Sequence, residues 1–217
     1  MSDSRPLAQS PSAGPSATSS APADGLASAC PKPDRTIVLV GLMGAGKSYI
    51  GRRLAQHYAI PFVDADEEIE KAAGLTIPEI FERYGEPHFR DGERRVIARL
   101  LDEPVHVLAT GGGAFIDPRT REKIRARAIS IWLRADLELL LRRVARRNNR
   151  PLLNTNDRRA TLERLIAERY PIYAEADITV DSLEGPTDST ADRVLAALER
   201  HLAGARSGVR AAAAVRS

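Results

Sequence analysis

The chain has 217 residues, of which 43% are hydrophobic and 28% are charged, and its formal net charge is +3. This length and composition fit one globular domain with spare length for tails. No apolar stretch approaches the roughly 20 residues of a membrane span, a single cysteine excludes an internal disulfide, and the mild charge does not indicate nucleic-acid binding. We therefore expect a cytoplasmic protein with no membrane and no nucleic-acid partner.

Residues 1–33 are rich in Ser, Ala and Pro, and Leu7 and Leu26 are their only large aliphatic residues. Such a segment buries too little apolar area to offset the entropy of ordering, so we expect a disordered tail. It lacks the apolar core of a secretory signal. Its many serines and few acids leave an organelle transit peptide as an alternative, against which its scarcity of arginine argues. We expect the folded domain over 34–203 and a flexible, Ala/Arg-rich tail over 204–217.

The first predicted strand, 35–40, leads into Gly-Leu-Met-Gly-Ala-Gly-Lys-Ser at 41–48. The glycines allow successive backbone N–H groups to point at phosphate oxygens, and a helix beginning near Lys47 directs its positive dipole end at the same anion. The Lys47 ammonium adds charge near the outer phosphates, and the Ser48 hydroxyl can ligate magnesium. This loop predicts binding of ATP or GTP, and the alternative is a glycine-rich turn that binds nothing.

Strand and helix patterns then alternate along the chain. The further strands are expected at 61–64, 105–109, 128–133 and 177–181. Three helix starts are recognisable. Thr76 with Glu79 forms a capping box, Asp117 before Pro118 is an N-cap, and Asp136 precedes apolar residues at helical spacing. The alternation predicts an α/β fold, in which a parallel sheet is covered by helices on both faces. Ligands of such sheets bind beyond the carboxyl ends of the strands.

The second and third predicted strands end in residues suited to phosphoryl transfer. Asp64 and Asp66 are two apart, so on an extended chain both carboxylates share one side. One can hold magnesium while the other takes the proton of an attacking hydroxyl, although Asp66 also fits the N-cap of the next helix. The third strand ends in Thr-Gly-Gly-Gly at 110–113 instead of the usual Asp, which makes Asp64 the better magnesium candidate. These glycines either let a small ligand approach closely or form a merely flexible turn.

Two arginines are suited to recognise a carboxylate on the acceptor. Arg90 and Glu93 lie three apart on one face of a helix that begins near Glu86 and Pro87, so the carboxylate can hold the guanidinium in place. A held guanidinium suits bidentate recognition of a carboxylate, whereas the alternative is an ordinary surface salt bridge. Arg169, in the sequence Arg-Tyr-Pro-Ile-Tyr, is the second such residue.

The basic stretch at 142–150 allows three interpretations. It runs from a helix end into a polar loop without interleaved aromatic residues, which argues against a nucleic-acid patch. A solvated helix face is a further alternative, and a mobile lid that closes on ATP is the interpretation that we favour. Lids of this kind exclude water and supply an arginine to the transferred phosphoryl group.

These motifs occur in the order found in shikimate kinases, and the chain resembles that family over roughly residues 33–203. The motifs are the loop at 41–48, Phe-Val-Asp-Ala-Asp at 62–66 with Ile69 and Glu70, Gly-Glu at 85–86 with Phe89, Arg90 and Glu93, Gly-Gly-Gly at 111–113, Arg-Pro-Leu-Leu at 150–153, and Arg169 with Pro171 and Tyr173. The Phe-Arg-x-x-Glu and Arg-Pro-Leu-Leu elements are far more specific than the phosphate loop.

The resemblance implies a three-layer P-loop kinase fold, similar to that of nucleoside-monophosphate kinases, with a mobile lid at about 146–157. The implied sheet is five-stranded and parallel, in the order 2-3-1-4-5. The implied reaction is transfer of the ATP γ-phosphate to the 3-hydroxyl of shikimate with one Mg²⁺ ion. We expect the protein to be a monomer.

By motif, the resemblance assigns shikimate binding to Asp66, Arg90, Gly112 and Arg169. It assigns the ATP contacts to Gly44, Ala45, Gly46, Lys47, Ser48, Tyr49, Arg143 and Arg150. Within that set, Arg143 lies near the adenine, and Arg150 reaches the phosphates from the lid. The implied catalytic residues are Lys47, Asp66 and Arg150, and the implied magnesium ligands are Ser48 and Asp64.

Two residues depart from the family's pattern. Tyr49 stands where the family usually has Thr, and we expect a change in packing rather than a loss of activity. Gly92, inside the Arg90 helix, costs roughly 1 kcal/mol of helix propensity. Gluconate-type kinases share the fold and the loop, so a small-molecule kinase with another acceptor is one alternative. A nucleotide-binding switch is another, although it has no evident use for Arg90 together with Arg169.

Overall fold

The computed structural model of the chain describes residues 32–145, 157–184 and 187–214. The predicted N-terminal tail at 1–33 lies almost wholly outside these residues, and so do the predicted lid at 146–157 and its Arg150. Within the described residues, no helix is long and apolar enough to cross a membrane.

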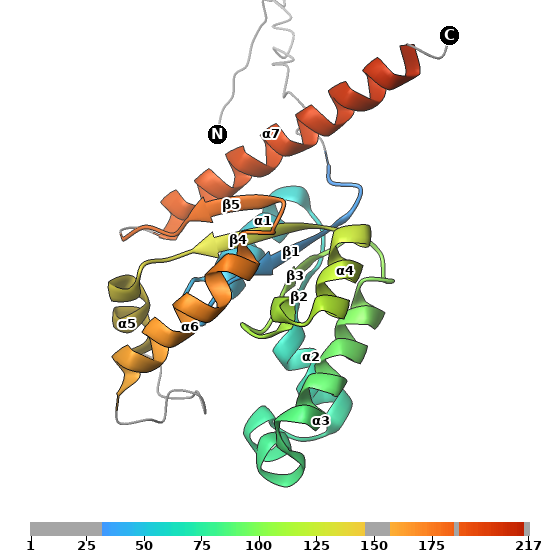
Figure 1. Cartoon of the computed structure of the whole chain (residues 1–217). Coiled ribbons are helices and arrows are strands. Elements are labelled where there is room, and N and C mark those ends of the chain that lie inside the picture. The colour runs from blue at the N-terminus through green and yellow to red at the C-terminus, as the bar shows by residue number, and fades with distance from the viewer. Residues whose placement is uncertain (1–31, 146–156, 185–186, 215–217) are drawn as a thin grey trace, which may run out of the picture.

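A parallel sheet of five strands forms the middle layer of the molecule (Figure 1). The strands are, in chain order, β1 (Thr36–Val40), β2 (Phe62–Asp64), β3 (Val107–Ala109), β4 (Ala128–Arg134) and β5 (Ile178–Asp181). Their spatial order, β2-β3-β1-β4-β5, confirms the order expected from the sequence. Because every pairing is parallel, the carboxyl ends of the strands meet at one edge of the sheet.

The central strand β1 brings the phosphate loop and the glycine triplet together at that edge. Every residue of β1 is buried, because β3 and β4 lie on either side and helices cover the faces. Just beyond β3, Thr110 donates both its N–H (3.2 Å) and its hydroxyl (3.0 Å) to the carbonyl of Leu39 in β1. These two bonds fix the start of the glycine triplet beside the start of the phosphate loop.

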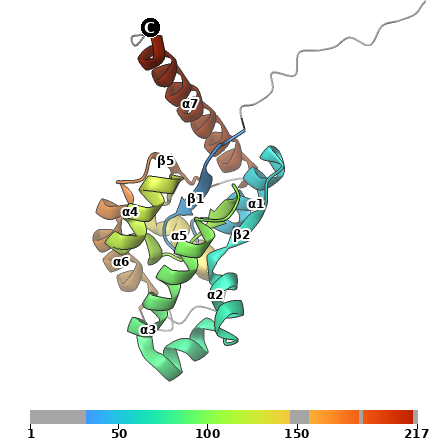
Figure 2. The same ribbon diagram turned by 90° about the vertical axis from the view of Figure 1, so that its right-hand side faces the viewer.

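Helices lie on both sides of the sheet. They are α1 (Lys47–Tyr58), α2 (Ala65–Ala73), α3 (Ile77–Leu100), α4 (Pro118–Arg127), α5 (Leu137–Ala145), α6 (Arg158–Tyr173) and α7 (Thr187–Ala214), with a short 3-10 helix, η1 (Ala114–Ile116), before α4. Helices α1 and α7 pack against each other and against the sheet, and α4 packs against β4 on the other side of β1 (Figure 2). Helix α7 continues past residue 203, where we expected the domain to end, and its far half extends away from the sheet (Figure 1).

All three helix starts that the sequence predicted are confirmed, and each has a polar capping residue. The Thr76 side chain accepts from the N–H of Glu79, while the Glu79 carboxylate accepts from the N–H of Thr76 at 2.8 Å. Asp117 accepts two N–H bonds from the first turn of α4, at 2.8 and 3.0 Å. Asp136 accepts from the N–H of Leu139 at 2.7 Å. In each case a short polar side chain satisfies backbone donors that the helix itself leaves unpaired.

Helix α3 consists of two helical parts that meet at a kink. Gly85 has φ 77° and ψ 173°, a conformation that is essentially restricted to glycine. The second part begins near Glu86 and Pro87, where the sequence predicted the start of the Arg90 helix. Helix α3 packs against α2, η1 and α4. Its second part carries Phe89, Arg90 and Glu93 to the edge of the sheet where the phosphate loop lies.

Candidate active site

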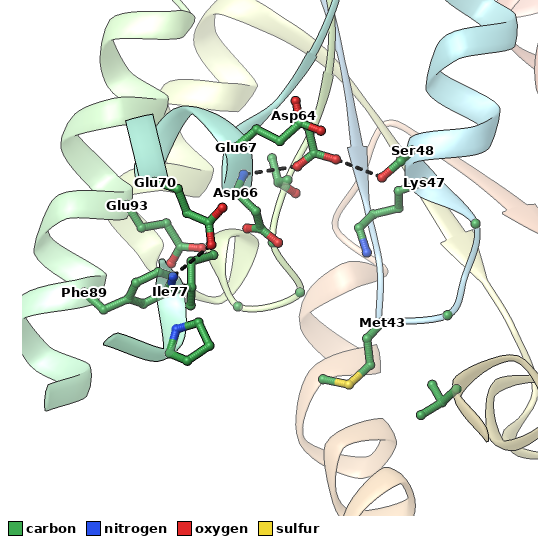
Figure 3. Close-up of a pocket in the computed structure, with 18 of the residues that line it drawn as sticks. Met43, Lys47, Ser48, Asp64, Asp66, Glu67, Glu70, Ile77, Phe89 and Glu93 are labelled. Carbon is green, nitrogen blue, oxygen red and sulfur yellow. Dashed lines mark hydrogen bonds between the residues drawn. The ribbon is translucent and has the colours of Figure 1, made fainter. Parts of the chain in front are cut away.

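A cleft of about 870 Å³ opens at the carboxyl edge of the sheet, between the phosphate loop and helices α2 and α3 (Figure 3). The predicted site residues that line it are Gly44, Gly46, Lys47, Ser48, Tyr49, Asp64, Asp66, Arg90, Gly112, Arg143 and Arg169. Ala45 is buried in the loop beneath this surface. The structure therefore brings together the residues that the sequence singled out from six separate segments. Arg150 lies outside the described residues.

The phosphate loop follows β1 in a conformation that its glycines make possible. Gly41 has φ 135°, and a Cβ atom at this position would lie 2.7 Å from the carbonyl oxygen of Leu133. Lys47, the first residue of α1, turns back across the loop and donates from Nζ to the carbonyls of Gly41 (2.8 Å) and Leu42 (3.1 Å). The ammonium group is thus held over the concave side of the loop, where the N-terminus of α1 also favours an anion.

Asp64 joins the phosphate loop to helix α2 (Figure 3). Its Oδ2 accepts a hydrogen bond from the Ser48 hydroxyl at 2.8 Å, and its Oδ1 accepts from the N–H of Asp66 at 3.1 Å. Asp64 is therefore the N-cap of α2, and the alternative in which Asp66 takes that role is wrong. The helix begins earlier than that alternative assumed, with Ala65 as its first residue.

Asp66 lines the cleft, but it lies in a helix and not in an extended segment as predicted. We expected Asp64 and Asp66 to share one side of an extended chain, but the strand ends at Asp64 and Asp66 lies in the first turn of α2. Both carboxylates nevertheless line the cleft. Asp66 Oδ1 lies against the glycine triplet, where a Cβ atom on Gly111 would come within 2.9 Å of it. A larger residue at 111 would displace the carboxylate.

Ser48 and Asp64 fit the requirements of a magnesium site. A hydroxyl and a carboxylate are the hard oxygen donors that Mg²⁺ prefers, and the ion is commonly bound by one or two such groups together with substrate phosphates and water. Their oxygens are 2.8 Å apart at the end of the phosphate loop, and both residues line the cleft. The donor set is thus compatible with an ion that also contacts a bound triphosphate.

Arg90 is held in place by carboxylates. Its Nη1 donates to Glu93 at 2.7 Å and its Nη2 donates to Glu86 at 3.1 Å. Burial disfavours the charge of Arg90, but these two carboxylates outweigh burial and raise the pKa of the guanidinium. The alternative of an ordinary surface salt bridge is wrong, since the Glu93 side chain is only 4% exposed.

Glu93 is the buried partner of this pair. Burial raises the pKa of its carboxyl group, an effect that Arg90 reduces without cancelling. Its second oxygen, Oε1, faces the glycine triplet, where a Cβ atom on Gly111 would lie 2.9 Å away. Glu93 and Asp66 therefore pack against the same glycine, which accounts for the small residue there.

The glycine triplet is a contact point for both arginines rather than a flexible turn. A Cβ atom on Gly113 would lie 2.3 Å from Nη1 of Arg90, so only glycine admits the guanidinium at this distance. Arg169 approaches from α6 and donates from Nη1 to the carbonyl of Gly112 at 3.0 Å. Two guanidinium groups from distant helices thus meet at one short turn, beside the phosphate loop.

Arg143 anchors the other end of the cleft. It donates from Nη1 to the Ser182 hydroxyl (2.9 Å) and to the carbonyls of Gly44 (3.3 Å) and Ala45 (3.4 Å), and from Nη2 to the carbonyl of Leu183 (3.2 Å). Burial lowers the pKa of this guanidinium. Arg143 therefore joins the phosphate loop to the segment that follows β5.

Two buried hydroxyl groups support the site, and the sequence reasoning gave neither of them a role: Ser182 was missed, and Tyr173 was named only as part of the Arg169 motif. Ser182, directly after β5, donates to the carbonyl of Ala45 at 3.2 Å, and Tyr173 donates to the carbonyl of Gly112. The strand-end rule, had it been applied to the fifth strand, would have found Ser182. Tyr173 lies four residues after Arg169, on the same face of a helix. Tyr49 is 43% exposed, so its departure from the family's pattern changes the wall of the cleft rather than the core.

The fold and the cleft define an ATP-dependent P-loop kinase that acts on an alcohol. The family model described as "Shikimate kinase" matches residues 43–199. A shikimate kinase of Rhodopseudomonas palustris is 60% identical over 172 residues, which cover 79% of this chain and 85% of that protein. The chain belongs to the shikimate kinase family.

Solved structures agree with this assignment. The structure of a shikimate kinase from Acinetobacter baumannii in complex with shikimate has a TM-score of 0.72 and 41% identity, and the match covers 74% of this chain and 90% of that one. A gluconokinase from Sinorhizobium meliloti has a TM-score of 0.60 over 82% of this chain and 99% of its own, at 18% identity. At that identity the second likeness concerns the fold alone.

Proposed function

We propose that the cleft transfers the γ-phosphate of ATP to the 3-hydroxyl of shikimate. The observation that carries this proposal is the meeting of the Arg90 and Arg169 guanidinium groups at the glycine turn beside the phosphate loop. Two planar guanidiniums suit a small carboxylate, and Asp66, against the same turn, suits the hydroxyls of that molecule. A kinase for an acceptor without a carboxylate has no evident use for both arginines.

The nucleotide occupies the other end of the cleft. Lys47 and the N–H groups of the phosphate loop hold the phosphates, and Arg143 lies near the adenine. Arg150, which lies outside the described residues, would reach the phosphates from the predicted lid. Ser48 and Asp64 would hold one Mg²⁺ ion, which supplies neutralisation of the phosphate charge when it is bound.

Asp66 is the base of the reaction. It takes the proton of the 3-hydroxyl while that oxygen forms its bond to the γ-phosphorus and the bond to the leaving ADP breaks. Its position in the cleft, against the glycine turn that both arginines contact, supports this role. Gly112, with Arg90 and Arg169, holds the acceptor so that its hydroxyl faces the loop.

The acceptor is tested by release of ADP from Mg-ATP, with shikimate, gluconate or a nucleoside monophosphate supplied in parallel to the purified full-length protein. We expect turnover with shikimate and background rates with the other two. The product is then identified as 3-phosphoshikimate by mass spectrometry. Turnover with gluconate but not with shikimate would overturn the assignment.

The protein works as a monomer in the cytoplasm, in this proposal. Each residue assigned above belongs to one chain, so no second copy is needed to complete the cleft. Light scattering coupled to gel filtration checks the state of assembly. A mass near 23.6 kDa that does not change between low and high micromolar concentration is expected, and a concentration-dependent dimer would contradict it.

A further inference from the structure

Tyr173 ends helix α6 directly behind the glycine turn of the cleft. Its side chain is fully buried among the rings of Trp132, Tyr170 and Phe115, with ring centroids 5.9, 6.3 and 6.5 Å away. At the end of this apolar enclosure its hydroxyl meets the carbonyl of Gly112. A hydroxyl in such surroundings depends on its protein partners, here the Gly112 carbonyl and Arg169, because water has little access.

The carbonyl of Gly112 accepts from two donors on the same helix. Arg169 donates from Nη1 at 3.0 Å, and Tyr173, one turn further along α6, donates from its hydroxyl. Burial raises the pKa of Tyr173 to about 12, so the phenol stays protonated and remains a donor throughout the neutral range. Both lone pairs of one carbonyl are thus occupied by α6.

This arrangement fixes a peptide group that both arginines share. The carbonyl of Gly112 and the N–H of Gly113 belong to one planar trans peptide and point in opposite directions. When the carbonyl is held towards α6, the rest of the peptide is held as well, including the Cα of Gly113 against which Arg90 packs. A rotation of this peptide would move both contacts at once.

We propose that Tyr173 is a positioning residue for the acceptor: its hydroxyl, with Arg169, orients the Gly112 peptide and so sets the spacing between the Arg90 and Arg169 guanidinium groups. This inference rests on the proposed function, since it assumes that the two guanidiniums bind the carboxylate of the substrate. Tyr173 is not among the residues that line the cleft, and it acts through the turn and through Arg169.

The test compares Tyr173→Phe with Tyr170→Phe. Each removes one hydroxyl and keeps the ring, but the hydroxyl of Tyr170 donates to the carbonyl of Ala135, outside the cleft. We expect Tyr173→Phe to raise the KM for shikimate about five- to tenfold, the worth of one hydrogen bond, and to leave the KM for ATP within twofold. Tyr170→Phe should keep both KM values.

Melting temperatures of all three proteins separate positioning from general support. An unchanged KM for shikimate in Tyr173→Phe would overturn the inference. A parallel rise in the KM values for shikimate and ATP, with a lowered melting temperature, would also overturn it, because that is the result expected of a merely structural hydroxyl. The wild-type assay reports separately on the proposed function. A wild-type protein that does not phosphorylate shikimate would overturn that function and this inference together.

Discussion

The nucleotide end and the acceptor end of one cleft are assembled in different ways. At the nucleotide end, Lys47 bonds to Gly41 and Leu42 of its own loop. At the acceptor end, Asp66, Arg90 and Arg169 come from three helices and meet at a glycine turn that follows β3. The first end is mostly a local structure, whereas the second exists only when distant segments are packed together.

This difference predicts which substitutions should weaken the binding of one substrate and leave the binding of the other unchanged. A local loop keeps its shape as long as its own backbone is intact, so changes at the acceptor end should leave ATP binding largely unchanged. The acceptor end has close tolerances, because Gly111 and Gly113 each lie against charged side chains at distances that exclude a methyl group. Small changes there should have large and selective effects.

The largest effect on the reaction rate is expected from a substitution of Asp66 at the acceptor end. Asp66→Asn keeps the shape of the side chain but removes the base, so kcat should fall by about 10²–10⁴. Steady-state kinetics with shikimate measure this, and Asp192→Asn is the matched control because Asp192 is exposed on α7 and does not line the cleft. An unchanged kcat in Asp66→Asn would leave Asp66 as a binding residue only.

The next effect tests the close tolerance of the acceptor end. In Gly113→Ala the new Cβ would lie 2.3 Å from Nη1 of Arg90, so the guanidinium must move. Gly113 has φ −97°, which any residue adopts, so the backbone is not strained. We expect the KM for shikimate to rise about 10- to 100-fold, as for a catalytic geometry displaced by about 1 Å, with the KM for ATP unchanged. Equal rises in both would show that the ends are not independent.

The same difference explains how far the sequence could predict each end. The phosphate loop is contiguous, so its residues at 41–48 and the start of α1 follow from the order of glycines, lysine and serine. Motif order likewise predicted the strand order and the residue types at the acceptor end. The sequence did not reveal that Glu93 is buried against Gly111, because this depends on the second part of α3 reaching the end of β3.

Local pattern was also unable to decide between two adjacent carboxylates. Asp64 and Asp66 both fit the N-cap of α2 by residue type. The choice depends on where β2 ends, and β2 ends at Asp64, where the Ser48 hydroxyl already holds the carboxylate from α1. A tertiary bond between α1 and the end of β2, absent from any local window, thus holds the residue that caps α2 and precedes Asp66.

A smaller and opposite selectivity is expected from the nucleotide end. Ser182→Ala removes the hydroxyl that joins Arg143 to the carbonyl of Ala45 in the loop. Since a buried hydrogen bond contributes about 1 kcal/mol, the KM for ATP should rise about fivefold while that for shikimate stays constant. Ser130→Ala is the control, because that buried serine bonds Asp177 away from the cleft. A change in the KM for shikimate alone would contradict the assignment of Ser182 to the nucleotide end.

The smallest effect is expected in the helix that carries Arg90, where a substitution should change the stability of the protein but not its activity. Gly92 lies in the second part of α3, and a Cβ atom there would meet nothing within 4 Å. Gly92→Ala should therefore raise the free energy of unfolding by about 0.5–1 kcal/mol through helix propensity and reduced freedom of the unfolded chain. Urea denaturation measures this change, and both KM values should match the wild type. Gly92 lies in the helix that carries Arg90, whereas Gly113 lies in the turn that the guanidinium contacts. A loss of shikimate affinity in Gly92→Ala would therefore mean that Arg90 is positioned by the flexibility of its helix rather than by the turn.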